Sequence, residues 1–292
     1  MRPHLRSVFL LATAGVLWST SGLILKSLPS VHWLAIAGIR SLFAALIFLP
    51  GLALPRPPAG RLLLLVLVYV LVVGALMGSM QLGTAAQGIW LQYSAPAIVA
   101  VWAWVTQRQR IRPAEFAAVV LTLVAVVLIA TGGHGRSHQE SVLLGLISGV
   151  AFATLVILLK LSGDAPPASI FFWTNLGTAA ILLPAALASG ISLPHGAREI
   201  LLLAVMGVFQ LGLAYYFFQW GLARTRALEA SLVVLLEPIL NPIWVYLCLG
   251  EVPSGRVLTG CVLIALALVG MALFPNRAAT SAEPTSPEAC RR

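Results

Sequence analysis

The chain has 292 residues, of which 60% are hydrophobic and 9% are charged, and its net charge is +9. A soluble domain carries about 25% charged residues, so this composition argues strongly against a soluble enzyme. It predicts instead an all-α integral membrane protein that crosses the bilayer many times. The basic residues lie in short clusters between apolar runs, which favours the membrane surface over nucleic acid as their partner.

Ten apolar runs, bounded by charges, prolines and glycines, predict ten transmembrane helices. Each run has 20 to 25 residues, enough to cross a hydrocarbon core of about 30 Å. We expect spans at 7–28, 32–54, 61–83, 86–106, 113–132, 141–161, 167–189, 198–222, 226–247 and 255–274. The first run is too long for a signal peptide and is interpreted as a retained span. Residues 276–292 are polar and predict a disordered cytoplasmic tail.

The lysines and arginines predict how the chain is oriented. If the N-terminus is cytoplasmic, 13 of them fall in inner segments and 4 in outer loops. This asymmetry indicates an N-in/C-in topology with an even number of spans. We expect a multi-pass protein of the bacterial cytoplasmic (inner) membrane.

The two halves of the sequence repeat each other. GVLWSTSGLILK at 15–26 matches GVAFATLVILLK at 149–160, and Pro96 and Trp102 match Pro238 and Trp244. The repeats, expected at 1–135 and 136–275, hold five spans each and therefore face opposite ways. Inverted repeats with a site at their interface are typical of transporters. A duplicated fold with a structural or lipid-scrambling role is the alternative.

Few sequence features point to other chemistry. The cysteines Cys248, Cys261 and Cys290 form no CxxC pair, so neither a disulfide framework nor a zinc site is expected. No phosphate-binding GxxxxGK[ST] motif exists, so the chain carries no ATP-hydrolysing domain of its own. We expect no cofactor and no metal.

These motifs resemble the drug/metabolite transporter (DMT) superfamily, and within it the EamA-type exporters with two five-helix domains. The resemblance covers about 1–275 and is carried by Gly15, Trp18 and Ser19, by Tyr215 to Gly221, and by Pro96 and Pro238. Trp18-Ser19-Thr20, Tyr93 and 212–221 also resemble YddG-type amino-acid exporters, although Phe152 and Ala95 stand where tryptophans would be expected. The resemblance implies export of aromatic and other amino acids.

Two charged residues, Glu237 and Arg40, lie eight or more residues inside predicted spans. A mid-bilayer carboxylate is costly unless it is paired, protonated or facing water, so Glu237 is a candidate proton-coupling or amine-binding group. The alternative is a packing carboxylate bonded to backbone that Pro238 frees. Arg40 has three possible roles: it holds a substrate carboxylate, pairs with Glu237, or snorkels to the outer surface.

The candidate substrate-binding residues are polar, aromatic and methionine side chains predicted near mid-span. They are Trp18, Ser19, Met80, Tyr93, Phe152, Trp173, Tyr215 and Asn241. Asn241 follows Glu237 by one turn and shares its helix face. Pro96 and Pro238 remove helical hydrogen bonds at matching positions and are candidate hinges. Packing is the alternative for each aromatic residue, and a static kink for each proline.

The sequence therefore predicts a secondary transporter that exports amino acids or similar metabolites by alternating access. Its partners would be the small substrate and the lipid bilayer, with the protein acting as a monomer or homodimer. Two alternatives stay open, a drug-cation efflux transporter of the same fold and a lipid scramblase. Phosphorylated substrates are less favoured, because Arg40 is the one basic residue away from the ends of a predicted span.

Overall fold

The computed structural model describes residues 3–107, 112–161, 165–191, 193–222, 225, 230 and 233–274. These residues form helices and no strand. Eight helical segments within them are long and apolar enough to cross a membrane, and two shorter apolar helices, Trp33–Ile47 and Leu236–Leu249, fall where the second and ninth spans were predicted. The all-α fold with ten membrane segments is confirmed. The predicted tail lies outside the described residues.

The first repeat comprises eight helical elements. They are α1 (Pro3–Ser19), α2 (Ser21–Lys26), α3 (Trp33–Ile47), the 3-10 helix η1 (Leu49–Ala53), α4 (Ala59–Leu82), α5 (Ala85–Gln92), α6 (Ala95–Gln107) and α7 (Pro113–Ala130). Side chains cap three of them, because His32 accepts from the Leu34 N–H, Thr84 accepts from the Gln87 N–H, and Glu115 accepts from the Arg112 N–H at the start of α7.

The second repeat follows the same plan. Its described elements are α8 (Arg136–Leu161), α9 (Pro167–Ala188), α10 (Ala197–Val205), the π-helical segment η2 (Met206–Leu213), α11 (Ala214–Leu222), α13 (Leu236–Leu249) and α14 (Gly255–Leu273). Gly250, with a φ of 71°, ends α13 in the left-handed conformation that glycine adopts without strain.

Two of the helix boundaries that differ from those predicted have a clear physical reason. α8 begins at Arg136, five residues before the apolar run, and an i,i+4 ion pair between Arg136 and Glu140 supports this polar first turn. α3 ends at Ile47, and the chain continues as η1, in whose first turn Pro50 needs no backbone N–H. Apolar patterning alone does not detect either effect.

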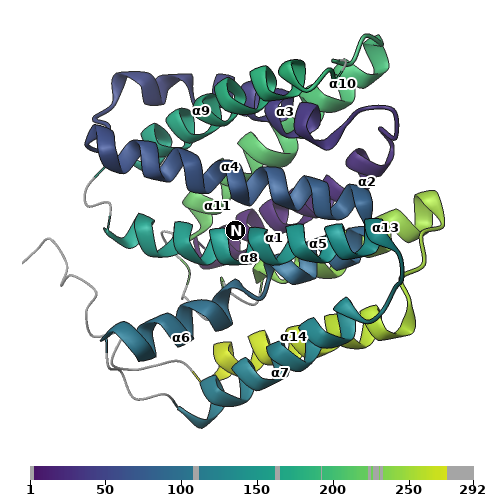
Figure 1. The fold of residues 1–292 in the computed structure, drawn as a ribbon. Helices are drawn as coiled ribbons and strands as arrows, with labels where there is room; N and C mark the ends of the chain where they lie inside the picture. The colour runs from purple at the N-terminus through teal and green to yellow at the C-terminus, as the bar shows by residue number, and fades with distance from the viewer. Residues whose placement is uncertain are drawn as a thin grey trace, which may run out of the picture.

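Helix packing follows the pseudo-twofold symmetry that inverted repeats require. α1 packs against α11 and α13, just as α8 packs against α4 and against α5 and α6. α3 contacts η2, just as α9 contacts α4, and the pairs α3–α9 and α7–α14 each join equivalent helices. Most of these contacts join one repeat to the other, so the repeats interleave (Figure 1).

Two glycines show the same symmetry at atomic scale. A Cβ on Gly149 would lie 2.8 Å from the Leu91 carbonyl oxygen, and one on Gly15 would lie 3.3 Å from the Val233 carbonyl oxygen. The repeat offsets of 134 and 142 relate these contacts, Gly15 to Gly149 and Leu91 to Val233. Glycine is repeated here because the first helix of each repeat passes close to backbone from the other repeat.

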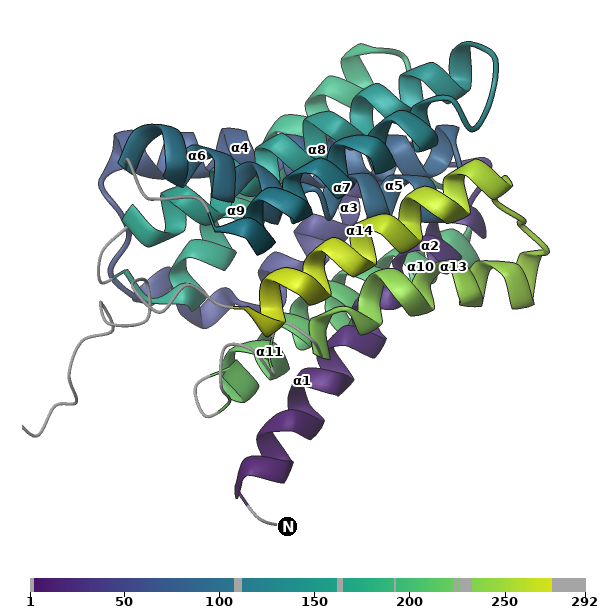
Figure 2. The same cartoon turned by 90° about the horizontal axis from the view of Figure 1, so that it is seen from below.

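α7 and α14 form a pair at one edge of the bundle (Figure 1), while α1 extends from the bundle toward its N-terminal end (Figure 2). Gly260 permits the close approach of the pair, since a Cβ there would lie 2.9 Å from the Ala125 carbonyl oxygen. Large apolar side chains such as Leu123 and Val262 are exposed on this pair, as expected of helices that face lipid.

Candidate functional site

Four of the described spans are interrupted near mid-length. The first breaks at Thr20 between α1 and α2, and the fourth breaks at Tyr93 and Ser94 between α5 and α6. In the eighth span the π-helical η2 separates α10 from α11, and in the ninth a turn at Leu235 precedes α13. Broken transmembrane helices and π-segments are frequent at transporter and other functional sites.

Both candidate hinge prolines begin helices at these breaks. Pro96 is the second residue of α6 and Pro238 the third residue of α13. In the first turn of a helix the missing N–H of proline is not needed for an intrahelical bond. The prolines therefore start a new helical half, and whether they act as hinges stays a prediction.

Arg40 lies at the centre of α3 and is buried, with 4% of its surface exposed. Its Nη1 donates to Gln210 Oε1 at 3.3 Å and lies 3.6 Å from Met77 Sδ, whereas Nε has no hydrogen-bond partner. Gln210 in turn donates from Nε2 to the Trp18 carbonyl oxygen. Within the described part of the chain, this buried cation has only uncharged partners.

Glu237, in the first turn of α13, faces the break of the fourth span. The Tyr93 hydroxyl donates to Glu237 Oε2 at 2.8 Å. Arg40 and Glu237 form no ion pair within 4 Å, but their charges interact through space, and Tyr215 interacts with both. We call Arg40, Tyr69, Tyr93, Gln210, Tyr215 and Glu237 the polar centre; Tyr69 belongs to it through its electrostatic interaction with Arg40.

Aromatic rings adjoin the polar centre. Trp18 meets Tyr215 edge-to-face with ring centroids 5.0 Å apart, and Phe218 lies 5.2 Å from Trp18. Phe171 of α9 also packs against Tyr215, with ring centroids 4.0 Å apart. Such rings supply an apolar wall and a face that attracts cations.

Two other predicted site residues join the first span to the ninth. Ser19 accepts a hydrogen bond from Trp244 Nε1 at 2.9 Å, and Asn241 donates from Nδ2 to Ser21 Oγ at 2.9 Å. A Cβ at Gly22 would overlap the Asn241 side chain, so glycine permits this contact. Asn241 and Glu237 are one turn apart, but they contact different elements.

The remaining predicted residues are distributed along the bundle. Met80, fully buried near the outer end of α4, packs closely on Gly88 of α5. Trp173 is near the inner end of α9, where the Arg56 guanidinium lies 5.8 Å from its ring centroid. Phe152 is half-buried against the main apolar core.

Sequence reasoning missed Tyr69 and a cluster of charges at the outer end. Lys26 Nζ forms an ion pair with Glu251 Oε2 at 2.8 Å and also donates to the Gly83 carbonyl oxygen, while Glu251 Oε1 accepts from the Ala85 N–H. These contacts, the outer latch, tie the first span to the third, fourth and ninth. Lys26 was noted as a repeat match, but no sequence pattern connects it with Glu251.

A second contact joins the two repeats at the outer end. Ser30 Oγ, in the loop before α3, donates to Glu199 Oε1 in the first turn of α10 at 2.8 Å. Elements from both repeats are therefore held together at the end that the charge distribution places outside.

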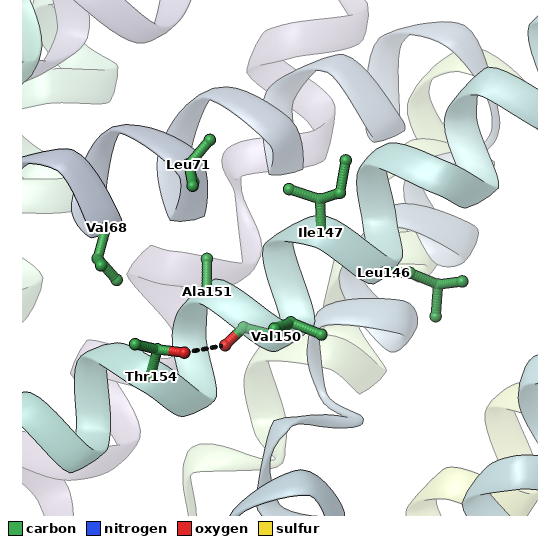
Figure 3. A pocket seen from close by; sticks show the side chains of 7 residues that line it. All are labelled: Val68, Leu71, Leu146, Ile147, Val150, Ala151 and Thr154. Carbon is green, nitrogen blue, oxygen red and sulfur yellow. Dashed lines mark hydrogen bonds between the residues drawn. The ribbon is translucent and has the colours of Figure 1, made fainter.

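A groove of about 330 Å³ lies elsewhere, on the surface between α4 and α8 (Figure 3). It is lined by Val68, Leu71, Leu146, Ile147, Val150, Ala151 and Thr154, and the Thr154 hydroxyl donates to the Val150 carbonyl oxygen. The groove is apolar and holds no residue of the polar centre. The described residues also contain no group of three or more His, Cys, Asp or Glu side chains suited to a metal.

The interleaved inverted repeats with broken helices define a multi-pass membrane transporter. The chain belongs to the EamA-like transporter family, whose model matches residues 5–131 and 139–273. It is 24% identical over 287 residues to human solute carrier family 35 member G1, a match that covers 91% of this chain and 78% of that protein. A protein of known crystal structure shares the fold with a TM-score of 0.68, at 19% identity over 93% of this chain and 98% of that chain.

Proposed function

We propose that this protein exports amino acids, aromatic ones among them, across the bacterial cytoplasmic membrane by alternating access. The observation that carries the proposal is that buried Arg40 bonds to Gln210 of η2 and half-buried Glu237 bonds to Tyr93 at the break of the fourth span, near a wall of aromatic rings. An amphipathic substrate with polar groups and a side chain needs both kinds of surface. Human solute carrier family 35 member G1 is named as a solute carrier, which accords with a small-molecule substrate.

The outer latch supports loading from the cytoplasm. Lys26 and Glu251 join the first span to the ninth at the outer end, and we expect a substrate to reach the polar centre from the inner side, as export requires. Because the repeats interleave, the moving units would each mix helices of both repeats: α1, α11 and α13 in one, and α8, α4 and α5 in the other. The breaks beside Pro96 and Pro238 would supply the hinges.

We assign the candidate residues according to their positions. Trp18, Tyr93 and Tyr215 would contact substrate beside Glu237, while Ser19 and Asn241 would hold the first span against the ninth. Met80, Phe152 and Trp173 would line the route toward either end. Glu237 would couple transport to protons, since its carboxylate faces the break of the fourth span.

Two alternatives make different demands on the structure. Lipophilic cations would be drawn to Glu237 but repelled by the buried guanidinium of Arg40. A scramblase needs a polar groove that faces lipid, whereas the groove between α4 and α8 is lined by apolar side chains and one internally bonded threonine (Figure 3). Amino-acid transport fits the charges and the surface better than either.

Proteoliposomes test the proposal. The purified chain would be reconstituted, and uptake of labelled aromatic, aliphatic and charged amino acids measured with and without a pH gradient. We expect saturable, competable uptake whose gradient dependence disappears in Glu237→Gln. If a lipophilic cation moves and no amino acid does, the protein is a drug-efflux transporter; if labelled lipid alone crosses, it is a scramblase.

A further inference from the structure

The polar centre contains one buried cation and one carboxylate that do not neutralise each other. We propose, resting on the function proposed above, that Arg40 binds the α-carboxylate and Glu237 the α-ammonium group of a free amino acid. Both charged groups of the substrate would then be recognised at once, and molecules that carry one of them alone would be rejected.

The Arg40 guanidinium lacks the partner that its burial demands. A buried cation is expensive unless a counter-charge and hydrogen bonds offset its lost hydration. Gln210 and Met77 supply uncharged contacts to Nη1, and Nε has no partner. A guanidinium binds a carboxylate through two parallel N–H donors, and the unpartnered Nε leaves one donor in place for such an anion.

Glu237 offers the complementary group. The Tyr93 hydroxyl bonds to Oε2, and the described residues show no hydrogen bond to Oε1, which leaves an acceptor for an ammonium N–H. The face of a nearby ring attracts the same cation, and Tyr215, which lies near both Arg40 and Glu237, packs against Trp18. The carboxylate and the ring together favour a cationic group at this position.

The absence of a direct bridge between Arg40 and Glu237 is what makes two-ended recognition possible. An ion pair within 4 Å would satisfy both charges and leave nothing for a ligand to complete, and the two residues form none. A zwitterion placed between them pairs each charge with its opposite while adding no net charge to the membrane interior. A lone amine or a lone acid would leave one buried charge without its partner.

Analogues of one amino acid test this assignment. Uptake of labelled phenylalanine into proteoliposomes would be competed with unlabelled phenylalanine, phenylalaninamide, phenethylamine and 3-phenylpropionate. We expect phenylalanine to compete at least about tenfold better than each analogue, since a charge-assisted contact typically contributes that much. Equal competition by phenylalaninamide in the unmodified protein would overturn the proposal without any variant.

Variants assign each group to its residue through selectivity. In Arg40→Gln, phenylalanine and phenylalaninamide should compete about equally well, while 3-phenylpropionate still competes poorly. If this variant no longer transports, ligand-induced thermal stabilisation gives the same comparison. In Glu237→Gln, phenylalanine and 3-phenylpropionate should compete about equally well, while phenylalaninamide still competes poorly. The exposed Arg61→Gln and Glu140→Gln are matched controls and should leave both ratios unchanged.

The outcomes separate the two proposals. If Arg40→Gln weakens every ligand equally and keeps the ratios, Arg40 is structural and the recognition proposal is wrong. If Arg40→Gln does not fold, the analogue series in the unmodified protein still decides. If that protein neither moves nor binds any amino acid, the proposed function itself fails.

Discussion

Buried charge is the feature of single residues that most needs explanation in this protein. Arg40 and Glu237 lie in spans whose other residues are largely apolar, and each has a polar partner that satisfies it only in part. Residues this costly inside a membrane usually mark a substrate or ion pathway. The proposed site therefore consists of groups whose hydrogen bonding and charge a bound substrate would complete.

Replacing Tyr93 with phenylalanine removes the hydroxyl that holds the Glu237 carboxylate and keeps the ring. We expect the KM for amino acids to rise about tenfold, the typical effect of losing a hydrogen bond to a charged group, with the protein still folded. Initial uptake rates against concentration measure it. Tyr216→Phe is the control, because Tyr216 is exposed and its ring packs against Trp220. An equal rise in KM in this variant would contradict the role of Tyr93.

Trp18→Ala should disrupt the aromatic wall. Its ring packs against Tyr215 and Phe218, so its loss should lower uptake of phenylalanine about tenfold and that of alanine less, since the larger side chain needs more apolar contact. Uptake of the two substrates by the same vesicles gives the ratio. A proportional loss for both would show a general packing role instead.

At residue scale, the sequence singled out many of the residues that the structure brings together around Arg40 and Glu237, but it missed what depends on tertiary contact. Glu237, Arg40, Trp18, Tyr93 and Tyr215 stand out because polar and aromatic residues are conspicuous within apolar runs. The bond from Tyr93 to Glu237 joins residues 144 positions apart, and no local pattern encodes it. Tyr69 was missed because nothing in its surrounding apolar run distinguishes it from interfacial tyrosines.

At the scale of elements, the helix breaks determine where the site can form. Apolar run length predicted the spans, but the breaks at Thr20, Tyr93 and Leu235 contain no distinctive local sequence apart from the following prolines in two cases. The π-helical η2 has no signal in the sequence at all. These irregularities arise from packing between repeats, which periodicity does not report.

The repeated glycines give a graded test of helix packing. Gly149→Ala should destabilise the protein by about 1–3 kcal/mol through overpacking, because its Cβ would lie 2.8 Å from a backbone oxygen. Gly15→Ala should cost less, since its nearest contacts are 3.2 and 3.3 Å. Gly270→Ala, with open space around it, should be neutral or slightly stabilising. Thermal unfolding in detergent ranks the three variants by stability. If Gly270→Ala were the least stable and Gly149→Ala the most stable, close helix packing at Gly149 would be refuted.

The outer latch predicts an accessibility change. In a chain whose Cys248, Cys261 and Cys290 are replaced by alanine, a cysteine at Ile89 would report opening, because Ile89 is fully buried one turn along α5 from Ala85. Adding Glu251→Gln should increase labelling by an impermeant maleimide from outside about tenfold, as loss of the ion pair shifts the population outward.

Glu140→Gln is the matched control for this experiment. It breaks the pair with Arg136, which is largely exposed on the same side of the membrane, and exposed pairs contribute little. Labelling should stay unchanged in this variant. Similar labelling of Ile89→Cys with and without Glu251→Gln would show that the latch does not hold the outer end closed.

For the whole molecule, the sequence predicted two inverted repeats but not that they interleave. Repeat matching finds similar segments, whereas the choice of packing partner depends on small residues such as Gly15 and Gly149 that bring specific helices together. The repeat symmetry is also incomplete at the outer latch. At the offset of 142, Glu251 corresponds to Gln109, so the acidic residue of the outer latch has a neutral sequence counterpart, which lies outside the described residues.

Counterflow of phenylalanine tests the central claim most directly. Vesicles containing the purified protein would be loaded with unlabelled phenylalanine and diluted into buffer that contains a trace of labelled phenylalanine. A carrier that alternates between two faces exchanges one molecule for another, so the account predicts a transient accumulation of label inside above its equilibrium level. Label that rises only to equilibrium, or does not enter at all, would contradict it.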